Sequence, residues 1–257
     1  MSTKFIILGC GSSMGVPRAD GFFGNCNPKN IKNYRTRCSS LIKFNDENFL
    51  IDTSPDLRQQ LISNKIKSIS KVFYTHLHAD QTHGINDLRP FFLINNKQIP
   101  VYADNKTYKY LYSTFKYCFK SSYGYPSTLI LKNLKKKQIF TNKKEKISIQ
   151  AVQAQHGKIE SVCYIINKKL AYASDISLIY KKDLKLFKKL DYFIIDCLWY
   201  RKHPAHYNLD QVLDLIKIIK PKKTILTNMH NELDYNDLIT RLPKTIIPGY
   251  DGMIINL

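Results

Sequence analysis

The stretch YTHLHADQTHG, at residues 74–84, constrains this chain more than any other part of its sequence. It places His76, His78, Asp80 and His83 within eight residues of one another. Imidazole nitrogens and carboxylate oxygens are the usual protein ligands of zinc and similar divalent cations. Residues two apart on an extended segment point to the same side, so His76 and His78 can reach one ion together. The fold must therefore bring further ligands to this segment from elsewhere.

Strand-like segments recur along the chain, and polar side chains follow their ends. The predicted strands are 4–8, 39–44, 48–52, 71–75, 147–152, 161–166, 169–174, 191–197 and 223–227. All seven histidines fall just past such strands. Strand ends meet at one rim of a sheet, so these side chains are expected to gather there. His156 is the best candidate for a third imidazole, and Asp175 can bridge two cations about 3.5–4 Å apart.

The order of the elements predicts the fold class. Early strands pair as hairpins, whereas later ones alternate with helices such as the one predicted over 208–219. Two mixed β-sheets packed face to face, with helices outside, fit that order and give a four-layer αββα sandwich of the α/β (α+β) class. No internal repeat and no linker divides the sequence, so residues 1–257 are expected to form a single domain.

Composition bears on partners and compartment. The net charge of +20 favours anionic partners such as phosphates or nucleic acid, although lysine-rich surface loops account for it equally simply. No apolar run of about 18 residues is present, so no membrane partner is expected. The six cysteines are scattered and form no CxxC pair, which is typical of reduced thiols. With no recognisable secretory signal, we expect a cytoplasmic protein.

The whole constellation resembles the metallo-β-lactamase fold of hydrolases, whose signature is HxHxDH followed by a distant His, an Asp and a last His. Within that superfamily the chain is most similar to the phosphoribosyl cyclic phosphodiesterase branch. The similarity covers nearly the whole chain and rests on four stretches, LGCGSS, YRTRCSSLIKFND, HYNLDQVL and GYDGMIINL. It implies a metal-dependent phosphoric diester hydrolase that acts on a small cyclic phosphodiester, with zinc as cofactor, and it also allows a homodimer.

The resemblance implies roles for individual residues. It assigns the first metal to His76, His78 and His156. Asp175 would bridge to a second metal, which would also take Asp80, residue 81 and a histidine after the last strand. His206, at the HYNLD position, would be the proton donor.

Two departures weaken the second metal position. Residue 81 is Gln, and the last histidine of the family matches Asn228. His230 lies two residues further on, and on an extended segment it would face the same side, so it is the expected substitute. His83 is an alternative ligand that can equally pack against the next helix. Fewer imidazoles favour one tight Zn²⁺ and a second ion, Zn²⁺ or a harder ion such as Mn²⁺, that is weak, exchangeable or absent.

Some members of this branch hold a structural zinc on closely spaced cysteines near the N-terminus. Here only Cys26 remains in that loop, with Cys38 twelve residues later, so both are expected to be ordinary buried thiols. Asp52 is expected to orient a ligand histidine rather than to bind metal itself.

The expected chemistry is hydrolysis of a phosphodiester. A zinc-activated hydroxide would attack phosphorus, and His206 would protonate the leaving alkoxide. We also expect Asp80 to be one of the catalytic residues. His203 is the second choice as proton donor. Arg89 is expected to clamp a phosphate, with a surface salt bridge as the equal alternative.

Ser12 and Ser13 lie in a glycine-rich turn whose amide N–H groups can face an anion. They complete the substrate-binding residues that we expect from the sequence.

Three other functions stay open from the sequence. A nuclease resembling ribonuclease Z suits the positive charge, although no inserted arm for gripping transfer RNA is visible. Hydrolysis of a thioester or lactone is also compatible with the fold. A degenerate member that binds a ligand without turnover is kept open by Gln81 and Asn228.

Overall fold

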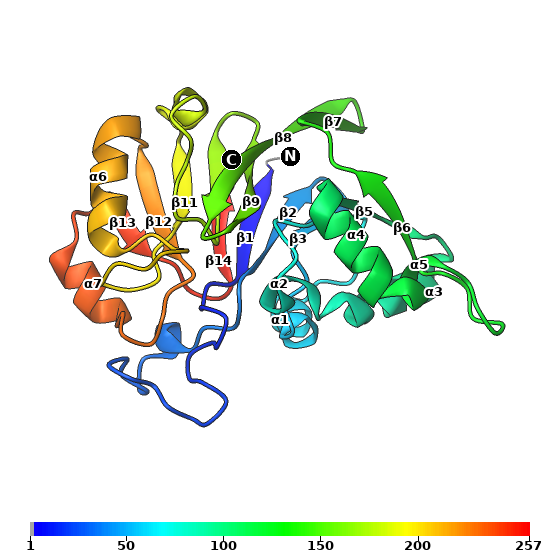
Figure 1. Ribbon diagram of the computed structural model, residues 1–257, viewed down its shortest axis with the longest axis horizontal. Coiled ribbons are helices and arrows are strands. Elements are labelled where there is room, and N and C mark those ends of the chain that lie inside the picture. The colour runs from blue at the N-terminus through cyan, green and yellow to red at the C-terminus, as the bar shows by residue number, and fades with distance from the viewer. Residues whose placement is uncertain (1–2) are drawn as a thin grey trace.

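The computed structural model describes residues 3–257, and its elements form two seven-stranded sheets stacked face to face (Figure 1). The first sheet has the strand order β14 (Met253–Asn256), β1 (Lys4–Gly9), β2 (Ser39–Phe44), β3 (Glu47–Ile51), β4 (Lys71–Phe73), β5 (Ile99–Ala103) and β6 (Leu129–Asn133). The second has the order β13 (Ile246–Pro248), β12 (Lys223–Thr227), β11 (Tyr192–Asp196), β10 (Leu170–Ala173), β9 (Ile159–Ile166), β8 (Glu145–His156) and β7 (Lys137–Asn142).

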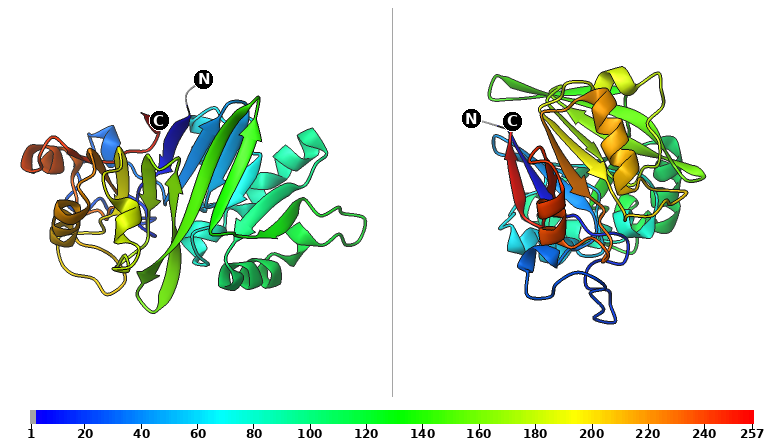
Figure 2. Two further views of the ribbon diagram at one scale, coloured as in Figure 1. Left: turned by 90° about the horizontal axis from the view of Figure 1, so that it is seen from above. Right: turned by 90° about the vertical axis from the view of Figure 1, so that its left-hand side faces the viewer.

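Helices cover the outer faces of both sheets. The α-helices are α1 (Leu57–Ser63), α2 (Ala79–Thr82), α3 (Arg89–Asn95), α4 (Asn105–Thr114), α5 (Lys116–Phe119), α6 (Leu209–Ile219) and α7 (Tyr235–Arg241). Short 3-10 turns occupy Ile31–Asn33, Ile85–Leu88 and Leu184–Phe187. Figure 2 shows α6 outside the second sheet, with α1 to α5 gathered around the first. The predicted four-layer sandwich is therefore confirmed, with two mixed sheets.

The strand sequences explain why the sheets are buried on both faces. In β1, Phe5 and Ile7 point into the core between the sheets, whereas Ile6 and Leu8 point into the core beneath α1 and α4. Successive side chains of a strand face opposite sides, so a continuous apolar run supplies two cores at once. On the other sheet, α6 packs Val212 and Leu215 against the outer face, where they join the same contiguous apolar cluster.

Asn208 begins α6 with a capping box. Its side chain accepts a hydrogen bond from the backbone N–H of Gln211, whose own side chain accepts one from the Asn208 N–H. Such a cap stabilises a helix start by about 1 kcal/mol. The helix predicted over 208–219 is thus confirmed, and its cap holds the preceding loop, which carries His206, against the second sheet.

Strand direction sets which residues share one rim. Strands β10, β11 and β12 run parallel to one another, and β8 runs the same way because both β8 and β10 are antiparallel to β9. Their carboxyl ends therefore lie at one edge of the sheet. His156 ends β8, Asp196 ends β11, and Asp175 and Asn228 lie just past β10 and β12.

Two further findings bear on the sequence-based expectations. All six cysteines are buried and unpaired within residues 3–257. None of the helices in that range combines the length and the apolar character that a membrane crossing requires.

Candidate metal centre

Three histidines from two sheets meet at this rim. His76 and His78 follow β4 of the first sheet, and His156 ends β8 of the second. Ring centroids lie 4.6 Å apart for His76 and His78, 4.9 Å for His76 and His156, and 5.1 Å for His78 and His156. One nitrogen of each lies within 4.8 Å of the others. The structure thus brings together the three imidazoles that sequence reasoning assigned to a first metal.

A chain of hydrogen bonds orients His76. The carboxylate of Asp52 accepts hydrogen bonds from the backbone N–H and the hydroxyl of Thr75, each at 2.8 Å. The Thr75 hydroxyl lies 3.0 Å from Nδ1 of His76. Asp52 itself has a left-handed backbone, with φ of 62°, and no exposed surface. Its expected orienting role is thus exerted through Thr75, which the sequence did not single out.

The hydrogen bonding of these imidazoles leaves ring nitrogens that a divalent cation can bind. Nε2 of His76 is buried and has no hydrogen-bond partner in the described part of the chain. Burial, and then the neighbouring His156 and His78, hold the pKa of His76 well below its usual value, so the ring is neutral. His156 donates its Nδ1 hydrogen to the carbonyl of Ala205 at 2.8 Å, which leaves Nε2 with a lone pair 3.3 Å from Nδ1 of His78. Converging lone pairs of neutral imidazoles are what zinc requires.

Carboxylates lie beside the imidazoles of His76, His78 and His156, which we call the histidine triad. Asp175 groups with His156 and His206 within 4.8 Å and has a left-handed φ of 53°. Burial, followed by the nearby Asp175 charge, raises the pKa of Asp80 to about 6 in the absence of a cation. Each of the two acids therefore makes the charged form of the other less favourable.

His206 is held by a second buried acid. Its Nδ1 lies 2.7 Å from Oδ2 of Asp196, which is fully buried and also accepts the N–H of Ile176. Burial alone lowers the pKa of His206, but the Asp196 charge and hydrogen bond outweigh it and raise that pKa to about 9. The ring centroid lies 4.8 Å from that of His156. A charged imidazolium therefore stands next to the triad at neutral pH.

A cavity of about 300 Å³ opens over these groups. His78, His156, Asp80 and Asp175 form one side, and Ser12, Ser13, Trp199, His203 and His206 are among the residues that complete it. Arg201 stacks on the Trp199 ring at 4.1 Å. Ser12 and Ser13 thus line the same cavity as the histidines, and their role in substrate binding stays a prediction.

His230 does not join the carboxylates, which corrects the expectation that it replaces the missing last histidine. Its ring packs against Trp199 at 5.2 Å, and it belongs to neither ligand group. The reason is the backbone of Asn228, which has a left-handed φ of 58°. The segment is therefore not extended, and the two-residue alternation fails. His83 also lies elsewhere, since its Nε2 is 3.1 Å from the Tyr110 hydroxyl and its ring contacts Phe115.

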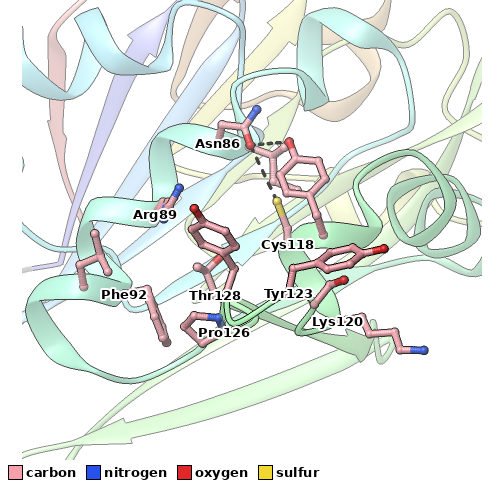
Figure 3. A pocket seen from close by; sticks show the side chains of 13 residues that line it. Asn86, Arg89, Phe92, Cys118, Lys120, Tyr123, Pro126 and Thr128 are labelled. Atoms are coloured by element: carbon pink, nitrogen blue, oxygen red, sulfur yellow. Dashed lines mark hydrogen bonds between the residues drawn. The ribbon is translucent and has the colours of Figure 1, made fainter.

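The position of Arg89 corrects the expectation that it clamps a phosphate. It begins α3, lies exposed with its guanidinium 5.7 Å from the Tyr125 ring centroid, and lines a separate cavity of about 670 Å³ (Figure 3). Phe92, Cys118 and Thr128 form the floor of that cavity. The turn at Ile85–Leu88 carries α3 away from the histidines, so Arg89 is not placed to clamp a phosphate there.

Two residues important to the rim were missed by sequence reasoning. Asp196 ends the strand DYFIIDC, and a carboxylate after four apolar strand residues at the same rim was the available signal. Arg35 is 1% exposed, and its guanidinium donates to the carbonyls of Leu233 and His230 and lies against the Cys26 thiol. An arginine in a polar loop gave no signal of burial.

Comparisons with known proteins agree with this arrangement. The family described as "Beta-lactamase superfamily domain" matches residues 47–229. A crystal structure of a new diphosphatase from the PhnP family superposes with a TM-score of 0.88 at 28% identity, covering 100% of this chain and 98% of that one. Zn²⁺-bound PqqB from Methylobacterium extorquens superposes with a TM-score of 0.76 at 16% identity, covering 99% and 100%. 

A curated relative, an octanoyltransferase of Porphyromonas gingivalis, is 30% identical over 97% of this chain. The chain spans about half the length of the curated relatives it matches.

Proposed function

Since this chain belongs to the β-lactamase superfamily, has the metallo-β-lactamase fold and brings three histidines together at one rim, we propose that it is a metal-dependent hydrolase that cleaves a small phosphoric diester, most simply a cyclic one. The observation that carries the proposal is the position of His206, whose Nδ1 lies 2.7 Å from Oδ2 of Asp196 and whose ring lies beside that of His156. The similarity to a diphosphatase of the PhnP family, at 28% identity over the full chain, supports a phosphorus centre.

His76, His78 and His156 would hold the cation, with Asp175 beside them. When bound there, a divalent cation supplies Lewis acidity and makes water a nucleophile near neutral pH. Zinc suits the three imidazoles.

The side chains of the protein account for the proton transfer. Water adds to phosphorus, and the bond from phosphorus to the leaving oxygen breaks. His206 gives its proton to that oxygen, and the proton released by the water restores the imidazolium. A leaving alkoxide needs such an acid, whereas a leaving thiolate does not, so His206 favours an oxygen ester over a thioester.

The cavity favours a small substrate. Its volume of about 300 Å³ lies at the lower end of the range for sites that enclose small molecules, which is about 300–1,000 Å³. Ser12 and Ser13 line it, and Trp199 offers an aromatic face for the organic part of the substrate.

The test is hydrolysis of bis-p-nitrophenyl phosphate and of a nucleoside cyclic phosphate with added Zn²⁺ or Mn²⁺, compared with a thioester, a lactone and structured RNA. We expect metal-dependent cleavage of the small diesters. Preferential cleavage of the thioester or lactone, or of RNA alone, would overturn the proposal.

A further inference from the structure

Two amide side chains lie among the carboxylates of the site. Gln81, on α2, is fully buried, and its Nε2 donates to Oδ2 of Asp80 at 3.2 Å and to Oδ2 of Asp175 at 3.1 Å. Asn228, buried after β12, directs its Nδ2 at Oδ1 of Asp175 at 3.2 Å. Both carboxylates that a second cation would bind therefore receive amide N–H groups.

The side-chain amide of Asn228 donates to Asp175, because the ring nitrogen of His206 beside it cannot accept a hydrogen bond. Nδ2 of Asn228 also lies 3.1 Å from Nδ1 of His206. That ring nitrogen carries the hydrogen donated to Asp196 at 2.7 Å. A protonated ring nitrogen has no lone pair to offer, so Asp175 is the acceptor.

Three hydrogen-bond donors face the carboxylate of Asp175. Oδ2 accepts the Ser174 hydroxyl at 2.6 Å in addition to Gln81, and Oδ1 accepts Asn228. A buried carboxylate is costly unless donors or a cation compensate its charge. Here the neutral side chains of Gln81, Ser174 and Asn228 donate to the carboxylate of Asp175 and compensate its charge, on the side where a second cation would lie.

We propose that the site holds a single divalent cation, and that the amides of Gln81 and Asn228 take the place of a second one by donating to Asp80 and Asp175. The inference rests on the proposed function, because it takes the triad of His76, His78 and His156 as the position of that cation. It identifies Gln81 and Asn228 as the residues that set the metal count.

The orientation of the Gln81 amide makes this inference specific. If the Gln81 amide were turned the other way, its Oε1 would face the oxygens of Asp80 and Asp175. Three hydrogen-bond acceptors would then lie together, and a cation between them would be needed to stabilise that arrangement. With Nε2 toward the carboxylates, as in this structure, both acids receive amide N–H groups, and Oε1 stays buried without a hydrogen-bond partner among residues 3–257. The two orientations thus correspond to different numbers of bound ions.

The backbone keeps Gln81 in this position. Its carbonyl accepts the N–H of Thr53 at 2.8 Å, and its N–H donates to the carbonyl of His78 at 3.1 Å. The Thr53 hydroxyl donates to the carbonyl of Thr82 at 3.0 Å. The short helix α2 is thereby fixed to the loop after β3, which holds the backbone of Gln81 beside the two carboxylates.

The experiment counts metal in the full-length protein. Protein stripped with chelator is titrated calorimetrically with Zn²⁺ and separately with Mn²⁺, and zinc-loaded protein is desalted and analysed by mass spectrometry. We expect one equivalent per chain with either ion. The double variant Gln81→His, Asn228→His restores imidazoles beside Asp80 and should bind two, doubling the metal content.

Asn86→His is the matched control, because it adds an imidazole in the separate cavity and should leave the count at one. If the double variant does not fold, the wild-type titration still decides the question. Two equivalents of comparable affinity in the wild type would overturn this inference while leaving the proposed function standing. No bound cation at all would overturn both.

Discussion

Nδ1 of His206 lies 2.7 Å from Oδ2 of Asp196, a carboxylate without exposed surface at the end of β11. This pair fixes the ring with its other nitrogen free and keeps the imidazole charged next to His156. An acid of this kind can protonate a leaving group. The pair therefore links the fold of the second sheet to the reaction proposed here.

Replacing His206, the proposed proton donor, should separate catalysis from metal binding. His206→Ala is expected to lower kcat for a phosphodiester roughly 10²–10⁴-fold, because a positioned proton donor contributes about that much. Metal content should stay unchanged. Arg89→Ala, in the separate cavity, is the control and should retain wild-type turnover. Loss of the metal in His206→Ala would make His206 a ligand instead.

Replacing the partner of the acid should move the pH profile. His206 acts in its protonated form, so kcat/KM should fall as pH rises through its pKa, which is about 9. Asp196→Asn removes the charge that raises this pKa and leaves the burial that lowers it. The alkaline limb should then shift to lower pH, although the charges of Asp175 and Asp80 still raise this pKa. An unmoved limb at equal metal content would show that another group titrates.

Metal removal should destabilise the protein. A ligand that binds only the folded state adds about 2.7 kcal/mol at a hundredfold excess over its Kd. We therefore expect chelator to lower the Tm of the wild type and to leave His156→Ala almost unaffected. Equal shifts in both proteins would mean that the stabilising ion binds outside the triad.

Arg35 should be a structural requirement of the loop between β1 and β2. Its guanidinium donates to the carbonyl of Leu233 at 2.6 Å and to Oδ1 of Asn33 at 3.1 Å. Arg35→Ala leaves these acceptors buried and unpaired, and should cost roughly 3 kcal/mol in the free energy of unfolding. Arg18→Ala, at an exposed ion pair with Asp20, should cost much less. Similar values for the two variants in urea denaturation would contradict this role.

The triad was predictable because local spacing and strand direction both point to it. His76 and His78 follow from a two-residue alternation, and His156 from a strand end at the shared rim. The sandwich was predictable from the order of hairpins and helices, although β5, β6, β7, β13 and β14 were missed. Lysines and exposed positions interrupt the apolar pattern of β6 and β7, and β5 carries a proline.

The errors arose where backbone conformation decides the outcome. His230 was expected to face the carboxylates, but a left-handed Asn228 turns the chain. Arg89 was expected near the ligands from its sequence distance alone, and the intervening turn carries it to another cavity. That Gln81 and Asn228 donate to Asp175 depends on side-chain positions which no sequence pattern encodes.

The central claim is that His76, His78 and His156 share a divalent cation. Its most direct test is a crystal structure of the zinc-loaded protein, with diffraction data collected on both sides of the zinc absorption edge. The account predicts one anomalous peak, within bonding distance of a nitrogen of each of the three rings. The absence of a peak there, or zinc bound only at other histidines, would contradict it.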